Sequence, residues 1–517
     1  MPSLQRLEQR TQAVPIRLLI SLLGTVSRAA LSFLNATLVA RGLGAGGYGN
    51  LSFLLASFSG LGVLWDAGVS QAFFTGIAGR RRGPRIFFLY SAWLAVQFSL
   101  TVTCIAVIFP GRWMHAVWLG QERPVILLAF LASFLTSQGW NTVQVLGEAV
   151  RKTSTVQLAT VLRAAAHTLL LLLAIHFVRL SVSIVFGFLI LEYVVGMAVV
   201  APRFLKANID REGADVDWKT LVHEFAAYCT PMVGYAILSF GYKFVDQWLL
   251  QRYGGSIQQG YFAFAQQFVN VALLATAAII NVLFKELSEA SKRGDHERVA
   301  RLHRRFSISL YAFTAWLIAL LLPCSRTILQ HTAGPQFTAG AMVFAVMLTF
   351  PLHQCLGQIN GTFFYATGNT RTLAWLGPIG MGLSIVGGYF TLAPRNAWLP
   401  GLGLGATALA VKMVVVQVVA VNLQLWLIAR HQKRHYRGFF QLMFFPLLGL
   451  SWLAQHALAG TTIPQIVQQG LAGLLYTSVT VALIFRFPLW VGLSPETMRT
   501  MWVWCLKHGW PTKASAL

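Results

Sequence analysis

Apolar runs of about 20 residues, the length that an α-helix needs to cross the hydrocarbon core of a bilayer, recur along the whole chain. Short polar stretches rich in Lys and Arg separate them. This pattern predicts an all-α polytopic membrane protein with about 14 transmembrane helices. The predicted segments are residues 16–40, 50–76, 86–109, 124–148, 155–177, 181–201, 224–250, 259–285, 306–328, 338–367, 373–393, 401–428, 439–458 and 464–488.

The composition agrees with a membrane protein. Hydrophobic residues make up 56% of the chain and charged residues 11%, whereas a soluble protein has about 25% charged residues. The 5 cysteines are scattered without a CxxC spacing, so neither a metal site nor a disulfide framework is indicated. The sequence also contains no phosphate-binding loop motif, and we expect no cofactor.

The 40 Lys and Arg residues are distributed unevenly between the predicted helices. If the N-terminus is cytoplasmic, 29 of them lie on the cytoplasmic side, 7 on the outer side and 4 within helices. Cytoplasmic loops carry an excess of Lys and Arg, so both termini are predicted to be cytoplasmic. The formal net charge of +24 would suggest nucleic acid in a soluble protein. Here it indicates contact with anionic membrane lipids, and we expect no nucleic-acid partner.

The end of the first predicted helix matches the end of the seventh at an offset of 211 residues. Without a gap, Leu38, Arg41, Gly44, Gly49 and Phe53 align with Leu249, Arg252, Gly255, Gly260 and Phe264. This repeat predicts two six-helix lobes that start on the same side and are related by an axis along the membrane normal. The alternative is that an arginine followed by glycines is simply a common turn between apolar helices.

The repeat and the segment pattern divide the chain into four parts. Residues 1–222 form an N-lobe with helices 1–6 and a cytoplasmic linker, and residues 223–430 form a C-lobe with helices 7–12. Residues 431–488 add helices 13 and 14. Residues 489–517 form a cytoplasmic tail whose apolar positions predict an amphipathic helix at the membrane surface.

Four cationic residues lie inside predicted membrane helices: Arg28, Arg163, Lys243 and Lys412. An Arg or Lys at the centre of such a helix costs about 2.5–3.5 kcal/mol on insertion scales, so it usually faces a bundle interior or a water-filled cavity. The four residues therefore predict a cationic cavity for a negatively charged substrate.

Three acidic residues also lie inside predicted helices: Asp66, Glu192 and Asp246. They offer an alternative, structural role for the cations through the pairs Arg28–Asp66, Arg163–Glu192 with His167 one turn on, and Lys243–Asp246. No other acidic residue lies at the depth of Lys412 in helices 7–12. The functional interpretation is that the three carboxylates exchange a coupling ion, either H⁺ or Na⁺.

Amide side chains recur in several predicted helices. Gln138, Asn141 and Gln144 are three residues apart and share one helix face. The full set predicts the polar lining of a cavity between the lobes, where repeated bundles place their substrate; it comprises Asn35, Gln138, Asn141, Gln144, Gln354, Gln358 and Asn360. The alternative is that these groups form hydrogen bonds between helices and hold the bundle together.

Four motifs combine into a family resemblance. They are Arg41-Gly-Leu-Gly44 with Gly47-Tyr48-Gly49, Asp66-Ala-Gly68, Asp246-Gln247 with Gly260-Tyr261, and Phe284-Lys-Glu-Leu287 with Arg293-Gly-Asp295. Together they resemble polysaccharide flippases of the Wzx type, in the multidrug/oligosaccharidyl-lipid/polysaccharide exporter (MOP) superfamily. The resemblance covers residues 16–430 by motif and 431–488 by helix count. Ser27-Arg28 and the Asp66 segment also resemble lipid II flippases, but Gln266-Gln267 stand where those proteins have an arginine.

The resemblance implies a transporter and not an enzyme. Such a flippase moves a polyprenyl-pyrophosphate-linked oligosaccharide from the cytoplasmic to the outer leaflet of the bacterial inner membrane. The glycan would serve cell-surface polysaccharide, such as lipopolysaccharide O-antigen or exopolysaccharide, together with polysaccharide assembly machinery. Two alternatives stay open: an ion-coupled multidrug or small-molecule exporter of the same superfamily, and a membrane glycan polymerase or ligase.

Overall fold

The computed structural model describes residues 14–79, 83–150, 152–208, 216–435, 438–460 and 463–492. Every regular element in these ranges is helical, and ten helices are long and apolar enough to cross a membrane. The all-α prediction is therefore confirmed. Each of the predicted segments overlaps a helix, but their number as spans stays a prediction. Residues 493–517 of the predicted tail lie outside the described residues.

The chain divides into two compact units. Unit 1 holds Met1–Phe264 and Met381–Leu409, and unit 2 holds Ala265–Gly380 and Ala410–Leu517. These boundaries differ from those of the predicted lobes because α10 (Trp218–Lys292), α14 (Thr370–Leu392) and α15 (Gly405–His431) each have residues in both units. The two six-helix lobes stay a prediction.

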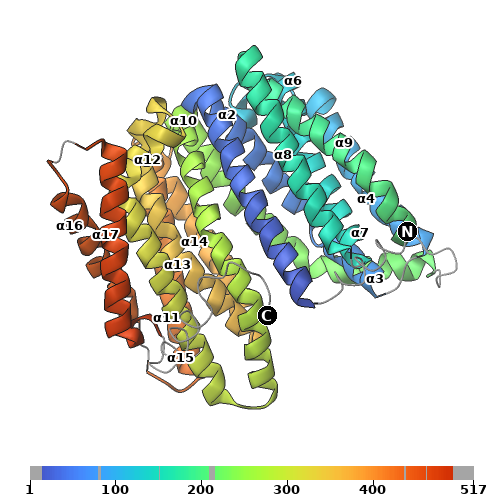
Figure 1. The fold of residues 1–517 in the computed structure, drawn as a ribbon. Coiled ribbons are helices and arrows are strands. Elements are labelled where there is room, and N and C mark those ends of the chain that lie inside the picture. Colours follow the sequence, from blue (N-terminus) through green and yellow to red (C-terminus); the bar gives the residue numbers. More distant parts are fainter. Residues whose placement is uncertain are drawn as a thin grey trace, which may run out of the picture. The chain divides into compact units, whose positions relative to one another are not determined.

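Unit 1 is built mainly from the first half of the chain, coloured blue to green in Figure 1. Its helices are α2 (Val14–Asp66), α3 (Val69–Ala78), α4 (Pro84–Thr103), α5 (Gly111–Trp118), α6 (Arg123–Phe134), α7 (Trp140–Ala149), α8 (Thr153–Phe177), α9 (Val182–Asn208) and the first part of α10. The end of α14 and the start of α15 also belong to it. Two π-helical turns, η1 (Cys104–Ile108) and η2 (Leu135–Gly139), extend α4 and α6.

Unit 2 contains most of the second half of the chain. Its helices are the end of α10, then α11 (His296–Leu321), α12 (Ser325–Thr332), α13 (Ala341–Ala366), the start of α14 (Thr370–Leu392), most of α15 (Gly405–His431), α16 (Phe444–Ala457) and α17 (Gln465–Arg486). Short 3₁₀ turns connect them: η3 (Leu322–Cys324), η4 (Pro335–Gly340), η5 (Phe439–Met443) and η6 (Pro488–Val491).

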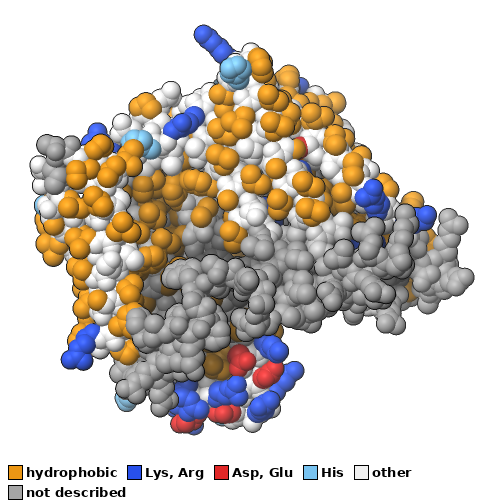
Figure 2. Space-filling model, in the orientation of Figure 1, with side chains coloured by type: hydrophobic (Ala, Val, Ile, Leu, Met, Phe, Trp, Pro, Cys, Tyr) orange, Lys and Arg blue, Asp and Glu red, His pale blue; other side chains and the backbone are white. Residues whose placement is uncertain are grey.

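The side chains of α8 show the distribution that hydrocarbon favours. Leu158, Leu162 and Leu169 are 58–60% exposed, whereas the polar Thr160 and His167 are buried. In lipid, polar groups need internal partners and apolar side chains can face outward. Figure 2 shows hydrophobic side chains over much of the drawn face, while charged side chains gather at its lower end, where Figure 1 draws the turn between α10 and α11.

Two glycines interrupt long helices at matching positions of the sequence repeat. Gly44 in α2 has φ 68° and ψ 176°, and Gly255 in α10 has φ 77° and ψ 174°. This region of backbone conformation is open essentially to glycine alone. The two motifs therefore share a backbone conformation as well as a sequence.

The second pair of matched glycines lies where the two motifs cross. A Cβ atom on Gly49 would lie 1.8 Å from the carbonyl O of Ser256, and one on Gly260 would lie 2.1 Å from the carbonyl O of Ala45. Ala45 and Ser256 are themselves matched by the offset of the repeat, so the two contacts are reciprocal. Glycine is required because no other residue permits this approach of the two backbones.

Candidate functional site

A break in the backbone between α2 and α3 positions the residues of the candidate site. Helix α2 ends at Asp66, and Ala67 and Gly68 have positive φ angles of 40° and 93° before α3 begins. The apolar run over residues 50–76 predicts one continuous helix, which the structure corrects. Interrupted backbone at membrane depth is tolerated where it is buried in protein or lines a cavity. Gly68 was the sequence signal for the break, because glycine favours positive φ.

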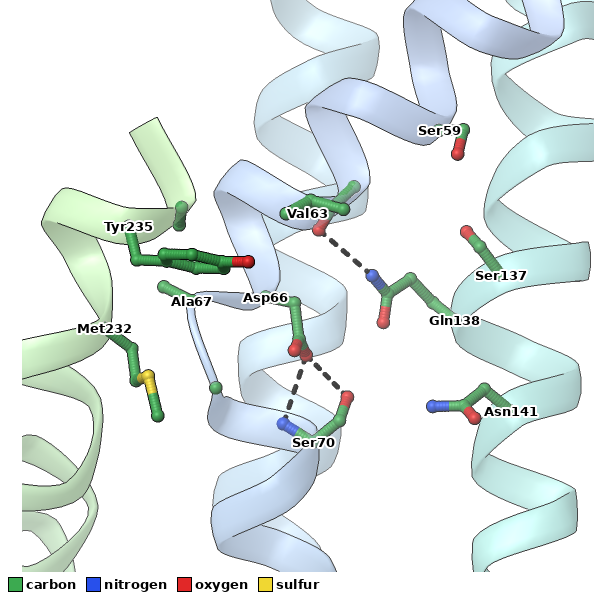
Figure 3. A pocket seen from close by; sticks show the side chains of 13 residues that line it. Ser59, Val63, Asp66, Ala67, Ser70, Ser137, Gln138, Asn141, Met232 and Tyr235 are labelled. Carbon is green, nitrogen blue, oxygen red and sulfur yellow. Dashed lines mark hydrogen bonds between the residues drawn. The ribbon is translucent and has the colours of Figure 1, made fainter. Parts of the chain in front are cut away.

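The Asp66 carboxylate holds the start of α3 (Figure 3). Its Oδ1 accepts hydrogen bonds from the backbone N of Ser70 at 3.1 Å and from the Ser70 hydroxyl at 2.5 Å. The Ser70 hydroxyl lies 3.2 Å from the hydroxyl of Tyr90, which lies 3.0 Å from Thr142 Oγ1. This network connects α3, α4 and α7, and it places a carboxylate beside the break.

These residues border a cavity of about 290 Å³ within unit 1. Gln138 comes from the π-helical turn η2, and Asn141 from α7. Met232 and Tyr235 of α10 lie on the opposite side of the cavity (Figure 3). Gln138 Nε2 donates to the carbonyl O of Gly62 at 3.4 Å. Because π-helical turns occur frequently at functional sites, η2 marks this cavity as the candidate site.

The cavity offers one carboxylate among neutral polar groups. Its polar lining consists of Asp66 with Ser59, Ser70, Ser137, Gln138, Asn141 and Tyr235. Hydroxyl and amide groups both donate and accept hydrogen bonds, whereas a carboxylate accepts them and attracts cations. No Lys or Arg is among the residues that line it in the described part of the chain. This pocket is therefore not the cationic cavity predicted from the sequence.

Arg163 takes part in a buried cluster of α8 and α9. Its Nη1 lies 2.6 Å from Glu192 Oε1, and His167 Nδ1 lies 3.0 Å from Glu192 Oε2. The Arg163 guanidinium also lies over the Tyr193 ring, 4.0 Å from its centroid. The side chains of Arg163 and Glu192 are 14% and 3% exposed. The ion pair and histidine considered from the sequence are thus present.

Asn35 connects two helices of unit 1. Its Nδ2 donates to the carbonyl O of Ala164 at 3.3 Å, and its Oδ1 accepts from the Thr168 hydroxyl at 2.7 Å. Both partners belong to α8, so the amide fastens α2 to α8. This is the interhelical hydrogen bonding that the sequence left open as the alternative to cavity lining.

The remaining charged candidates are distributed over three helices. Arg28 in α2 is half-buried, Lys243 in α10 is exposed, and Asp246 lies one turn further along α10 and is buried. Lys412 in α15 is buried and belongs to unit 2. None of the four lines the Asp66 pocket.

The amide side chains of the tenth predicted segment, residues 338–367, lie in unit 2 on α13. Asn360 is fully buried; its Oδ1 lies 3.0 Å from His303 Nε2, and its Nδ2 donates to Gln424 Oε1 at 3.3 Å. Gln354 and Gln358 are half-buried. Gln144 of α7 is also half-buried and is not a lining residue of the Asp66 pocket. Of the predicted amides, Gln138 and Asn141 line that pocket.

Some residues of the site carried no signal in the sequence. Tyr90, Thr142 and Met232 are residue types common in membrane helices, and no spacing singles them out. Their helices bring them to Asp66 only in the folded unit. Among the described residues, no group of three or more His, Cys, Asp and Glu side chains is placed to hold a metal ion.

Comparison with solved structures places this fold among membrane transporters. The chain shares its fold with MATE-family and other MOP-superfamily transporters. It is similar over 91% of its length to the whole of an inward-closed structure of the lipid II flippase MurJ, with a TM-score of 0.67 and 14% identity.

Two further structures match less of the chain. An inward-facing MATE-family multidrug resistance transporter has a TM-score of 0.52 and 13% identity over 82% of this chain and 97% of its own. A MOP-superfamily transporter from Pyrococcus furiosus has a TM-score of 0.52 and 12% identity over 81% and 96%. No family model and no curated protein matches the sequence. The apolar helices and this fold support a multi-pass membrane protein.

Proposed function

We propose that this protein is a flippase of the MOP superfamily. Its substrate is a polyprenyl-pyrophosphate-linked oligosaccharide, which it moves from the cytoplasmic to the outer leaflet of a bacterial inner membrane by alternating access. The observation that carries this proposal is an apolar groove of about 730 Å³ in unit 2. It lies along α11, α16 and α17 and is lined by Ala312, Phe313, Trp316, Leu447, Gly449, Leu450, Leu453, Val481, Leu483 and Ile484, among others.

The groove suits a long hydrocarbon chain. Lipid tails are as apolar as leucine, so a membrane-embedded groove attracts a particular chain by packing and not by removing it from water. A groove this large lets branched isoprenoid units pack against Phe313 and Trp316 while the polar head lies elsewhere.

The fold comparison supports the same proposal. The structure that matches 91% of this chain is described as a lipid II flippase, whereas the multidrug transporter matches 82%. The match to the lipid II flippase thus extends over more of this chain than the match to the multidrug transporter, with TM-scores of 0.67 and 0.52. The glycan would be passed on to polysaccharide assembly machinery for O-antigen or exopolysaccharide.

The roles of individual residues belong to the proposal. Lys412, Arg28 and Lys243 are proposed to contact the pyrophosphate, while the ion pair of Arg163 with Glu192 favours a structural role for that arginine. Gln138 and Asn141 are proposed to contact the glycan. Asp66, Asp246 and Glu192 are the candidates for coupling to H⁺ or Na⁺, and Asp66 lines the cavity of unit 1 described above.

The groove can be tested by filling it. A Cβ atom on Gly449 in the groove, or on Gly470 of α17 outside it, would meet no atom within 4 Å, so both sites accept a side chain. Purified protein in proteoliposomes should transfer a fluorescent polyprenyl-pyrophosphate glycan to the leaflet where an impermeant quencher reaches it. Gly449→Phe should slow this transfer at least about tenfold, a barrier change of about 1.4 kcal/mol, and Gly470→Phe should leave it unchanged. Equal rates for the two variants would contradict the proposal.

The proposed pyrophosphate contact needs a second test. Lys412→Ala should abolish glycan transfer without lowering the amount of protein in the membrane, because a buried cation that meets the substrate is removed. Lys285→Ala removes an exposed lysine of unit 2 and should transfer at the wild-type rate. Full activity of Lys412→Ala would remove that residue from the site.

One observation favours the exporter alternative. The Asp66 pocket contains a carboxylate, and none of its described lining residues is Lys or Arg. This charge suits a cationic small molecule. The same proteoliposomes therefore test a cationic dye. Dye export that is lost in Asp66→Asn, combined with no glycan transfer by the wild type, would replace the flippase proposal with the exporter.

A further inference from the structure

A second polar cavity, of about 350 Å³, lies within unit 2 between α11 and the end of α15. We call it the Arg304 pocket. One wall comes from α11 and the other from the last turns of α15 and the residues after it. Its polar lining consists of His303, Arg304, Ser307, Gln432, Lys433, Arg434 and His435, and its apolar lining includes Leu425, Ile428 and Phe440. No acidic residue lines it within the described part of the chain.

The cations of this pocket differ in what they contact. Arg434 Nη2 lies 3.5 Å from Glu297 Oε1, so part of its charge is already balanced. Within the described residues, Arg304 and Lys433 have no recorded hydrogen bond or ion pair. His303 is held in place by its bond to Asn360. Among the described residues, the pocket therefore presents two cations that have no acidic partner.

Lys433 has an unusual backbone conformation at the end of α15. Helix α15 ends with the N of Lys433 bonded to the carbonyl O of Arg430 at 3.1 Å and the N of Arg434 bonded to that of Ala429 at 2.9 Å. This is a Schellman ending, in which the residue with positive φ is usually glycine. Here Lys433 has φ 53°. A lysine at this position has a conformational cost that glycine would not have.

Two buried polar atoms point to a ligand as well. Ser307 is 2% exposed, and its Oγ has no hydrogen-bond partner among the described residues. The buried Gln432 Nε2 also has none among them. Ser307 and Gln432 both line the Arg304 pocket, and both side chains can donate hydrogen bonds. Burying such a donor without an acceptor is costly, so the pair calls for an acceptor in the pocket.

We propose that the Arg304 pocket binds a phosphate group. A phosphate supplies acceptor oxygens for the donors of Ser307 and Gln432. It also supplies negative charge opposite the cations of Arg304 and Lys433. The phosphate can belong to an anionic lipid headgroup, for which Phe440 and Leu425 provide an apolar wall, or to a soluble pyrophosphate. The predicted topology places the pocket on the cytoplasmic side. The site is separate from the proposed transport of a glycan and does not depend on it.

The competing interpretation is that the cations only orient the protein and balance the helix dipole at the end of α15. Matched variants separate the two. Arg304→Ala and Lys433→Gly each remove a cation from the pocket, and Lys433→Gly also relieves the positive φ, so its unfolding temperature should hold or rise. Arg293→Ala removes an exposed cation from the nearby turn after α10, outside the pocket.

Binding is measured on full-length protein in nanodiscs of phosphatidylcholine. One arm titrates radiolabelled inorganic pyrophosphate, and the other adds phosphatidylglycerol and counts the lipids retained by native mass spectrometry. We expect Arg304→Ala and Lys433→Gly to weaken binding at least about tenfold, equivalent to 1.4 kcal/mol, and Arg293→Ala to match the wild type. Pyrophosphate binding without lipid retention identifies a soluble source, and the reverse identifies the headgroup. The proposal is overturned if neither probe binds, or if all three variants bind like the wild type.

Discussion

Arg163 of unit 1 and Arg304 of unit 2 both lie on long helices close to a histidine, yet their surroundings are opposite. Arg163 is 14% exposed in its side chain, pairs with Glu192 at 2.6 Å and stacks on Tyr193. Arg304 is exposed and faces a cavity that no described acidic residue lines. The first charge is balanced by the fold and the second is not.

The comparison distinguishes a cation that is paired within the protein from a cation that can bind an anionic ligand. A buried ion pair leaves little charge for a substrate, because each partner already neutralises the other. A cation beside buried donors without acceptors can still bind an anion. Intramembrane position alone therefore does not identify a substrate-binding cation, and the partners must be examined.

The largest expected effect comes from breaking the balanced pair. Glu192→Ala leaves Arg163 without its carboxylate in a buried site and should lower the free energy of unfolding by about 3–5 kcal/mol. Thermal or denaturant unfolding of the purified protein measures this. Glu148→Ala, which removes an exposed acid of α7, should stay within about 0.5 kcal/mol of wild type. If the two variants are equally stable, Arg163 is not held by Glu192.

The two histidines that line the Arg304 pocket allow a similar comparison between a buried and an exposed side chain. His303→Leu should cost about 1–3 kcal/mol, because it leaves the buried Asn360 Oδ1 without its partner. The exposed His435 lines the same pocket, and His435→Leu should change the free energy of unfolding by less than about 0.5 kcal/mol. Equal losses of unfolding free energy in the two variants would show that His303 is no more important for stability than His435.

The aromatic contact of Arg163 should have a smaller effect. Tyr193→Leu removes a ring 4.0 Å from the guanidinium carbon and should cost about 2 kcal/mol, the value for a desolvated cation–π contact. Tyr253→Leu removes an exposed ring 5.8 Å from Arg252 and should cost about 0.5 kcal/mol. Unfolding midpoints of both variants measure the difference, and a reversed order would contradict the buried role of Arg163.

Arg304→Ala should have the smallest effect on stability. Because the fold gives this side chain no described partner, its loss should change the free energy of unfolding by at most about 0.5 kcal/mol. Arg163→Ala, measured in parallel in phosphate-free buffer, should cost about 3–5 kcal/mol, because the buried Glu192 loses its arginine partner and keeps only His167. Similar losses for the two arginines would remove the contrast between them.

Part of the candidate site could be predicted from the sequence. Asp66 stood out as an acid inside an apolar run, and Gln138 and Asn141 stood out by their spacing on one helix face. Pairing of Arg163 with Glu192 was foreseeable because α8 and α9 are consecutive and both residues lie within apolar segments. The cationic cavity was not supported in the same way, because Arg28, Lys243 and Lys412 lie on different helices and their neighbours depend on packing.

The sequence by itself determined the helical segments, because crossing a bilayer is decided by the length and polarity of each local run. It also determined the matched glycines, since Gly44 and Gly255 adopt a conformation that other residues avoid. Gly68 was a sequence signal for the break after Asp66, but only the tertiary structure decided the cavity beside it. It likewise decided that Ser307 on α11 lines the same cavity as the cations after α15, because that cavity is built from chain segments more than 100 residues apart.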